Sequence, residues 1–283
     1  MIQKSEVRSQ KTETKKFRLL PVKIMLVGTT LCLMAFSPAQ AYEKIVVLYP
    51  AVSPILIELG ASDMVVGTTR TDHAVKDAVK VGSHLRPNIE LLNALAPDLI
   101  IAGSRRAFPE EMKERVKADI FYYDPATLDD ILVKIEEIGA MLERKDKAED
   151  LIARLKKRLA EISPLPTEPS VIYEVMAEPL RVAGKKSILT SIISAAGGKN
   201  LVSINRKHAV ISTEKVLKLE PDFYIYQVGP MNKNPVPPEE RPFYKSLKSK
   251  FIRINELAFA RPGINAFDAA VELNRIFQGA AHE

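Results

Sequence analysis

The chain has 283 residues, a formal net charge of +6 at pH 7 and one cysteine, Cys32. Residues 1–41 carry seven Lys or Arg and two acidic residues, so the rest of the chain keeps a net charge of only +1. A nearly neutral chain gives little electrostatic support for nucleic-acid binding, and we expect no nucleic-acid partner. Residues 42–283 contain no cysteine, and they are numerous enough for two modest cores without disulfides.

The first 41 residues have the composition of a secretory signal peptide. Basic residues precede the 13-residue apolar run from Ile24 to Phe36, and Ala39-Gln40-Ala41 is a small-x-small cleavage site. An apolar run of this length is too short to cross the roughly 30 Å apolar core of a bilayer. Leu31, before Cys32, is larger than the residue usual there in lipoprotein signals. We therefore expect cleavage near Ala41 and a soluble protein that is exported to a periplasmic or other extracytoplasmic location.

Short strands and helices alternate between residues 42 and 126. Short apolar runs that end in polar loops predict buried strands, as in parallel sheets. We predict strands over 44–49, 64–67, 99–102 and 120–123, and helices over 53–59, 90–96 and 109–116. This alternation implies crossover connections and therefore a mostly parallel sheet with helices on both faces.

Residues 127–163 form a predicted helical connector. Thr127 with Asp130, and Asp146 with Glu149, each place a capping residue three positions before an acid, which favours two helices in series. The second would start at Lys147 and extend about 24 Å before the prolines that follow residue 163. One face of the first helix is apolar, because apolar residues recur at steps of three and four: Leu128, Ile131, Leu132, Ile135, Ile138 and Leu142.

Residues 164–283 repeat the order of elements of the first half. We predict strands over 171–175, 223–226 and 251–254, and helices over 187–196, 214–219 and 265–277. The predicted fold is α/β, with two Rossmann-like lobes of mostly parallel sheet, residues 42–126 and 164–283, joined by a long helical linker.

The two halves share a sequence phrase. Residues 90–101, ELLNALAPDLII, and residues 214–225, EKVLKLEPDFYI, both read as a helix, a Pro-Asp turn and a buried strand, with a constant offset of 124 residues. Pro-Asp turns are common, so two unrelated units remain an alternative. The ungapped match of Glu, Pro, Asp and the apolar positions favours duplication.

Ligands of open α/β sheets bind beyond the carboxyl ends of the strands. Two lobes that face each other would bring the loops at these ends together as the walls of one cleft. Arginines are concentrated there, which suggests a medium-sized anionic ligand held through carboxylate or phosphate contacts. The candidate ligand-binding residues outside the histidines are Tyr49, Arg70, Arg86, Arg105, Arg206, Tyr226 and Arg261.

Three segments together resemble the substrate-binding proteins of bacterial ABC importers, in the class whose lobes are joined by a long helix. They are residues 86–101, RPNIELLNALAPDLII, residues 184–201, with GKKS and AAGGKNL, and Arg261-Pro-Gly. The class carries iron-siderophores, haem or vitamin B12, and the resemblance covers residues 43–277. It implies a monomeric binding protein with no catalytic residue and no intrinsic cofactor, which delivers an iron chelate, haem or corrinoid to a permease dimer with its ATPase subunits.

In that class one exposed glutamate per lobe docks into arginine pockets of the permease. The matching positions are Glu90 and Glu214, the same pair that begins the repeated phrase. A carboxylate in the first turn of a helix is stabilised by the helix dipole and stays exposed, so two of them can bind two guanidinium groups. First-turn acids are favoured in helices in any case, which is the plain structural alternative.

His84 and His208 each lie six residues before one of these glutamates and are therefore also 124 residues apart. Repeat symmetry would place the two imidazoles in matching loops on opposite walls of the cleft. Neutral imidazole is a common iron ligand, so we hypothesise that both coordinate one iron-containing ligand. They could equally hydrogen-bond the loops or the ligand's edge. Haem-binding members of the class often carry a tyrosine where this chain has Ser83, which puts the usual haem ligation in doubt.

Three other functions stay open. Vitamin B12 or a related corrinoid is the alternative ligand, because the GKKS and AGGKN segments resemble those members at least as closely. A secreted metal-dependent hydrolase using His73 and His84 is a remote alternative, since neither a Gly-x-Ser-x-Gly nor a His-Glu-x-x-His motif is present. The third is an envelope sensor or carrier that never meets a permease.

Overall fold

The computed structural model describes residues 42–281. The predicted signal peptide therefore lies outside the described residues. Within the described range, no helix combines the length and the apolar character that crossing a membrane requires.

The first lobe is built on a five-stranded parallel sheet in the order β3-β2-β1-β6-β7. Its strands are β1 (Ile45–Val47), β2 (Val65–Thr68), β3 (Val79–Lys80), β6 (Leu99–Ala102) and β7 (Asp119–Tyr122). Its helices are α1 (Ser53–Glu58), α2 (Ile89–Leu95) and α3 (Glu110–Lys113), with a 3-10 turn, η1, at Ser62–Met64. A small antiparallel hairpin, β4 (Gly82–Ser83) and β5 (Arg86–Pro87), occupies a stretch in which no strand was predicted from the sequence.

The second lobe is built on a mixed sheet in the order β11-β9-β8-β12-β13, with β10 also paired to β8. Its strands are β8 (Ser170–Met176), β9 (Arg181–Ala183), β10 (Lys199–Asn200), β11 (His208–Val210), β12 (Phe223–Val228) and β13 (Lys250–Asn255). Strands β9 and β11 are antiparallel to their neighbours, and the other pairs are parallel. The remaining elements are α6 (Ile188–Ala195), α7 (Thr213–Leu219), α8 (Glu256–Phe259), α9 (Asn265–Ala281), and the 3-10 turns η2 (Pro238–Glu240) and η3 (Pro242–Tyr244).

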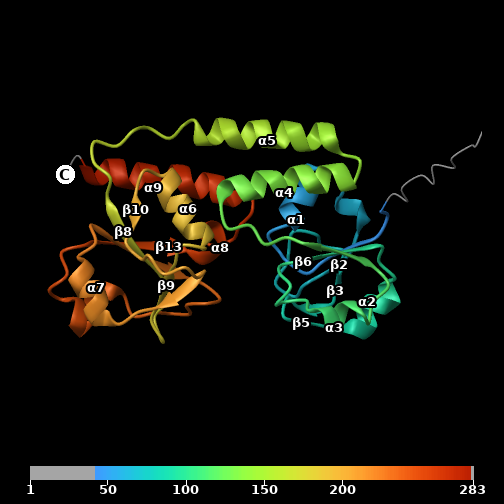
Figure 1. The fold of residues 1–283 in the computed structure, drawn as a ribbon, viewed down its shortest axis with the longest axis horizontal. Coiled ribbons are helices and arrows are strands. Elements are labelled where there is room, and N and C mark those ends of the chain that lie inside the picture. The colour runs from blue at the N-terminus through green and yellow to red at the C-terminus, as the bar shows by residue number, and fades with distance from the viewer. Residues whose placement is uncertain (1–41, 282–283) are drawn as a thin grey trace, which may run out of the picture. The chain divides into compact units, whose positions relative to one another are not determined.

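The connector is a pair of helices, α4 (Leu128–Met141) and α5 (Lys145–Leu159), that lie side by side (Figure 1). Thr127 caps α4 as predicted: its side chain accepts from the N–H of Asp130, whose carboxylate accepts from the N–H of Thr127. The predicted cap at Asp146 is wrong, because α5 already begins at Lys145 and its N-cap residue, Arg144, makes no capping bond. Helix α5 also ends at Leu159, ahead of the prolines.

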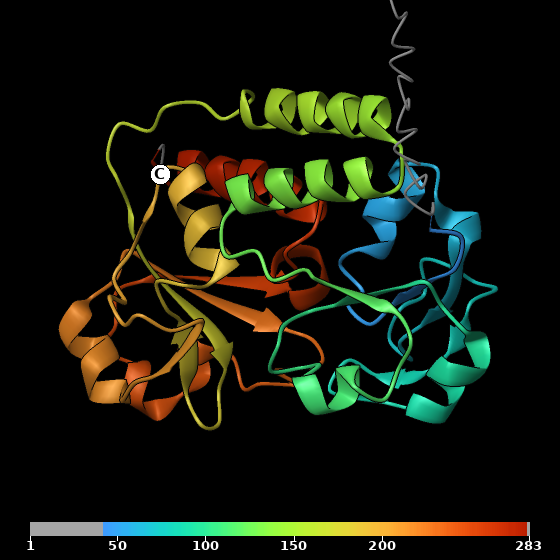
Figure 2. The same cartoon turned by 45° about the vertical axis from the view of Figure 1, so that its right-hand side comes forward.

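Helices α4, α5 and α9 lie along the same side of both sheets, as two views agree (Figures 1 and 2). Alternate residues of the strands point to that side, for example Val47 of β1 and Tyr173 of β8. Their side chains join those of Ile131 and Ile135 from α4 in one continuous apolar cluster. Since this core continues from one lobe into the other, the fold is the predicted α/β arrangement of two lobes joined by helices. The domain boundaries at residues 126 and 163 remain a prediction.

Both copies of the repeated phrase fold alike, as predicted. Asn88 and Ser212, 124 residues apart, cap α2 and α7, and each side chain accepts from the N–H three residues later. Both helices end on a left-handed residue, with φ of 45° at Ala96 and 41° at Glu220. The following aspartates also match. Asp98 accepts from the N–H groups of residues 43 and 44 just before β1, and Asp222 accepts from the N–H and hydroxyl of Ser170 at the start of β8.

Candidate functional site: the recess between the lobes

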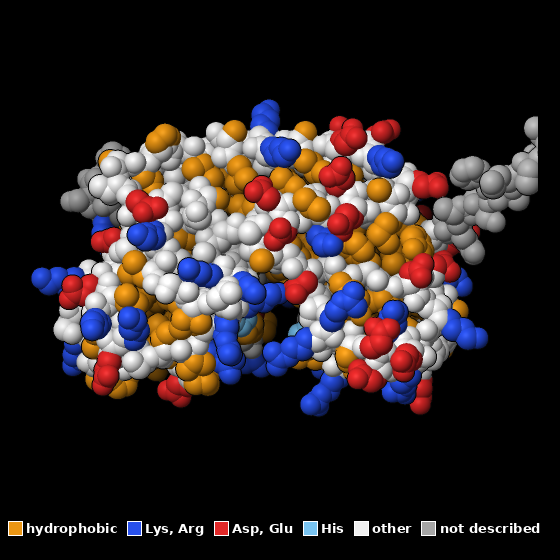
Figure 3. Space-filling model, viewed as in Figure 1, with side chains coloured by type: hydrophobic (Ala, Val, Ile, Leu, Met, Phe, Trp, Pro, Cys, Tyr) orange, Lys and Arg blue, Asp and Glu red, His pale blue; other side chains and the backbone are white. Residues whose placement is uncertain are grey.

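A recess separates the two lobes on the face opposite α4 and α5, and Lys, Arg and His side chains lie on both of its sides (Figure 3). Lys207 of the second lobe forms an ion pair with Asp124, which follows the carboxyl end of β7 in the first. Nearby, the buried hydroxyl of Tyr123 donates to the carbonyl oxygen of Pro262 over 2.8 Å. The carboxyl edge of the first sheet therefore faces the second lobe, as the loop argument predicted.

On the first-lobe wall, the β4–β5 hairpin carries His84 and Arg86, both exposed. The hairpin is attached beyond the end of β2 by a 2.8 Å hydrogen bond from the N–H of Arg70 to the carbonyl oxygen of Gly82. Gly82 has φ of +108°, and a Cβ there would lie 2.7 Å from the carbonyl oxygen of Arg86. Only glycine fits this tight turn, so the sequence fixes how the hairpin is presented. Arg105 stacks over the ring of Tyr122, 4.6 Å from its centre.

On the second-lobe wall, two loops approach each other closely. The N–H of Gly184 donates to the carbonyl oxygen of Lys207, and that of Lys185 to Ile204, both over 2.9 Å. A Cβ on Gly184 would lie 2.3 Å from the carbonyl oxygen of Arg206, so this approach requires glycine. The contact gathers four exposed basic side chains beside His208: Lys185, Lys186, Arg206 and Lys207.

The sequence analysis did not name the three lysines of this group among its candidate ligand-binding residues. Lys185 and Lys186 belong to the GKKS segment, which the sequence analysis used only for its resemblance. Arg206-Lys207 directly before His208 was the available signal, but the loop pairing that joins them to Lys185 and Lys186 is visible only in the fold.

Both histidines favour the neutral form. Although much of the His84 side chain is exposed, partial desolvation of its imidazole lowers its pKa below the usual value. Burial also lowers the pKa of His208, and the charges of Lys207 and Arg181 lower it further. A neutral imidazole keeps a lone pair for a metal or a hydrogen bond. Within residues 42–281 no group of three or more His, Cys, Asp or Glu is placed to hold a metal ion.

Tyr49 and Arg261 lie in one electrostatic neighbourhood at the contact between the lobes. Burial raises the pKa of Tyr49 to about 12, the charge of Asp124 adds to this rise, and Arg261 opposes it. Tyr49 thus stays protonated and can donate a hydrogen bond.

Tyr226, another predicted ligand-binding residue, lies elsewhere. It is buried on β12 and lines a separate cavity of about 250 Å³ with Pro235 and Arg253.

Glu90 and Glu214 occupy equivalent positions, the second residue of α2 and of α7. Both are exposed, and neither makes an ion pair with another described residue. Leu92 of α2 and Val216 of α7 pack on the sheet faces opposite the shared core. The two acids are therefore carried on the side of the molecule away from α4 and α5 (Figure 1).

The second lobe also contains a buried ionic network that the sequence did not reveal. Glu174 of β8 is fully buried and binds Arg241 through two hydrogen bonds of 2.6 and 2.9 Å. The hydroxyl of Tyr224 donates to the same carboxylate over 2.6 Å. Burial, with the charge of Glu174, raises the pKa of Tyr224 far above its usual value, so this hydroxyl remains a donor.

Comparison with known proteins agrees with this architecture. A family model described as periplasmic binding protein matches residues 45–243. A Bacillus subtilis (strain 168) protein, described as an uncharacterized ABC transporter substrate-binding lipoprotein, is 29% identical over 202 residues, which cover 66% of this chain and 64% of that protein. The chain thus spans a little less than two thirds of this relative.

Two further proteins carry ligand names. A vitamin B12-binding protein of Yersinia pseudotuberculosis (serotype O:3, strain YPIII) is 24% identical over 201 residues, covering 66% of this chain and 70% of that protein. The S. aureus protein IsdE, solved in complex with haem, superposes with a TM-score of 0.71 at 21% identity, covering 83% of this chain and 98% of IsdE. The structural similarity to IsdE establishes the fold alone. Since the family model spans well over half of the sequence, the chain belongs to the periplasmic binding protein family.

Proposed function

We propose that the protein captures an iron complex, a ferric siderophore or haem, in the recess between its lobes and delivers it to an ABC permease dimer with its ATPase subunits. The observation that carries the proposal is the pair of basic walls. Arg70, Arg86 and Arg105 extend from the first lobe, and the basic group around His208 extends from the second. Charges of one sign on both sides of a recess concentrate an anionic ligand there.

His84 and His208 supply the second part of the proposal. Each is on a loop or edge strand held by backbone hydrogen bonds, and the lowered pKa of each favours the neutral imidazole. In this proposal the two imidazoles approach one chelated iron from opposite sides. Tyr49 and Arg261 would bind the ligand's polar groups at the contact between the lobes.

A corrinoid is the alternative ligand, and the vitamin B12-binding relative favours it. Titration of the purified protein with haemin, a ferric siderophore and cobalamin separates the possibilities, because each has its own absorption spectrum. We expect a shifted spectrum with an iron complex, lost or changed on substitution of His84 and His208 by Ala. A haem band unchanged in both variants would remove the histidines as ligands, and a response to cobalamin alone would replace iron by a corrinoid.

Delivery to a permease is proposed from the exposed pair Glu90 and Glu214. Arginine pockets on a permease could bind both carboxylates bidentately only when both lobes are correctly placed. Charge reversal of both to Lys should abolish uptake while ligand affinity stays unchanged. Unchanged uptake would instead favour a sensor or carrier that works without a permease.

We propose that the protein is not an enzyme and acts as a monomer. The relatives compared above are solute-binding proteins. An assay of the purified protein for phosphatase and esterase activity tests the hydrolase alternative directly, and light scattering gives the oligomeric state.

A further inference from the structure

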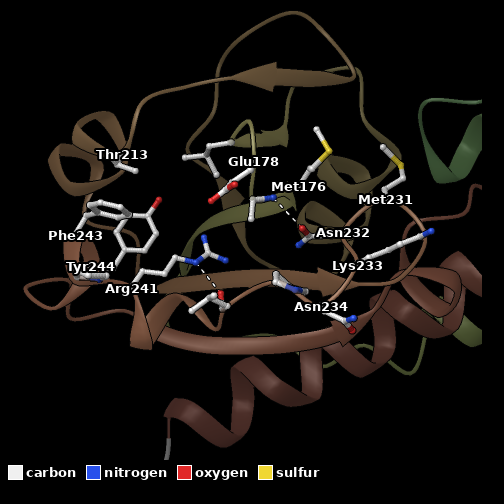
Figure 4. A pocket seen from close by; sticks show the side chains of 15 residues that line it. Met176, Glu178, Thr213, Met231, Asn232, Lys233, Asn234, Arg241, Phe243 and Tyr244 are labelled. Carbon is white, nitrogen blue, oxygen red and sulfur yellow. Dashed lines mark hydrogen bonds between the residues drawn. The ribbon is translucent and has the colours of Figure 1, made fainter.

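A pocket of about 550 Å³ lies within the second lobe (Figure 4). Its walls come from the turn between β8 and β9, the loop 231–236, η3 and the first residue of α7. Thr213 and Phe243 lie at one end of the pocket, and Met231 and Lys233 lie at the other. All of the lining residues belong to the second lobe, and the pocket lies beyond the carboxyl ends of β8 and β12.

The pocket presents apolar side chains to solvent. Phe243 is 59% exposed, Val236 57% and Met231 42%, and all three line it. Single exposed apolar residues are ordinary, but three that share one concave surface mark an interaction site. Methionine thioethers and an aromatic ring adapt to apolar or aromatic partners of varied shape.

At the base of the pocket, side-chain hydrogen bonds hold the walls together and the charge of Arg241 is paired. Arg241 binds the buried carboxylate of Glu174 through both terminal nitrogens, and its Nε donates to the carbonyl oxygen of Val236 over 2.8 Å. Asn232 accepts from the N–H of Ala177 over 3.0 Å and so joins the two walls. A pocket held in this way is formed before a partner arrives, which lowers the entropic cost of binding. Arg241 is paired, and the other charged lining residues, Glu178 and Lys233, are of opposite sign, so the lining has no excess charge that would favour an anion. The exposed apolar side chains therefore suit an apolar group better.

The position of the pocket points to the identity of that partner. Thr213 immediately precedes Glu214, the proposed docking acid of this lobe. At the other end, the N–H of Met231 donates to Glu256 over 2.7 Å, and the charge of Arg261 acts on both Glu256 and Tyr49. The pocket therefore extends from the docking acid toward the contact between the lobes, where the ligand would lie.

We infer that this pocket receives an apolar or aromatic side chain from an extracytoplasmic loop of the ABC permease, next to the guanidinium group that Glu214 binds. The inference rests on the proposed docking function and adds the second contact of the same interface. A charge pair fixes orientation and speeds association, whereas a buried apolar anchor carries most of the binding energy. The ion pair of Glu214 and the apolar contact in the pocket would form at the same time, since Thr213, which lines the pocket, is adjacent to Glu214.

The test uses Phe243→Asp and, independently, Val236→Asp. Both side chains are more than half exposed, so the folded state should tolerate each change. Val133→Asp on α4 is the matched control, because Val133 is also an exposed apolar residue, at 50%, but lies on the connector. The permease complex, purified in detergent, serves as the partner, and haemin serves as the ligand probe.

We expect Phe243→Asp and Val236→Asp to weaken permease binding by about tenfold, the effect of losing one apolar anchor. Val133→Asp and the haemin affinity of all variants should stay within about twofold of the original protein, well below one anchor's effect. A fall in haemin affinity in the two pocket variants would overturn the inference and assign the pocket to the ligand.

Glu214→Lys distinguishes the inference from the docking proposal. Weaker binding with Glu214→Lys but unchanged binding with both pocket variants would overturn the pocket contact and leave the acid in place. Weaker binding with the pocket variants but not with Glu214→Lys would support the pocket contact and exclude Glu214 as a docking residue.

A fluorescent label gives a direct readout of the contact. Phe243→Cys can be labelled with a polarity-sensitive fluorophore, since residues 42–283 contain no other cysteine. Its emission should shift when the permease is added, and an unchanged emission would contradict a buried contact.

Discussion

Lys207 and Asp124 form an ion pair that connects the two lobes directly beside His208. The side chains are 49% and 44% exposed, so water and salt screen the pair. Exposed pairs of this kind contribute about 0–1 kcal/mol to stability. The contact is therefore weak, and the carboxylate of Asp124 would compete with the proposed anionic ligand for the ammonium group of Lys207.

The first prediction is that Asp124→Asn raises the affinity for an anionic ligand several-fold, about 1 kcal/mol or less. The free energy of unfolding should change by less than about 1 kcal/mol. Titration at low and high salt checks the cause, because the gain should shrink as salt increases. Glu110→Gln, which removes the partner of exposed Lys113 in α3, is the control and should leave affinity unchanged. An equal gain in ligand affinity in both variants would mean that the change in net charge, and not the loss of the Lys207–Asp124 ion pair, causes the effect.

The second prediction concerns the two matching caps. Asn88→Ala and Ser212→Ala each remove the side chain that accepts the N–H of the third helical residue, and each should lower the free energy of unfolding by about 1 kcal/mol. The same changes loosen the turns that carry Glu90 and Glu214, so permease binding should also weaken. Thr127→Ala on α4 is the matched control. It should cost similar stability in denaturant unfolding but leave permease binding intact, and a loss there would indicate a general folding effect.

The helix caps could be predicted from the sequence only in part. Thr127 with Asp130 has the spacing of a capping box, and α4 confirms it. The same spacing failed for Asp146, because α5 follows α4 after a turn too short to leave room for a separate cap. The left-handed residue that allows this turn is Glu143, with φ of 56°. A non-glycine residue rarely signals such a conformation in sequence.

The residues of the candidate site, too, could be predicted from the sequence only in part. The loops that follow parallel strands are placed by topology, so Arg70, Arg105 and Tyr49 could be predicted from the order of elements alone. Strand β11, which carries His208, has three residues and pairs with the equally short β9. Strands of this length leave no periodic pattern to detect. Tyr226 looked like a strand-end residue because β12 extends two residues further than its apolar run suggested.

The third prediction tests the buried pair Glu174–Arg241. Arg241→Met would leave the fully buried carboxylate of Glu174 without its partner and should cost about 3–5 kcal/mol of unfolding free energy. The double variant Glu174→Gln with Arg241→Met removes both charges and should recover a large part of this loss in urea unfolding. Arg154→Met, which breaks the exposed pair with Glu58, is the control and should cost less than about 1 kcal/mol. A double variant as unstable as the single one would show that packing, not charge, stabilises this site.

The fourth prediction follows from Glu256, the buried first residue of α8. Burial raises the pKa of its carboxyl above the usual value of 4.5, against the opposing effects of the Met231 N–H and the Arg261 charge. Between 4.5 and the raised pKa the folded state therefore binds more protons than the unfolded state. The contribution of this group to stability is complete below pH 4.5 and is lost as the pH rises through the raised pKa.

Glu256→Gln removes this titration, so the unfolding free energy of the original protein minus that of the variant should increase as the pH falls from 7 to 4. The difference should become constant below pH 4.5, where the carboxyl is protonated in both states. Urea unfolding at half-unit pH intervals measures it. Glu240→Gln, at an exposed position, serves as the control for the loss of one negative charge. A Glu256→Gln difference that decreases toward acid pH would mean that the N–H of Met231 and Arg261 outweigh burial at this carboxylate.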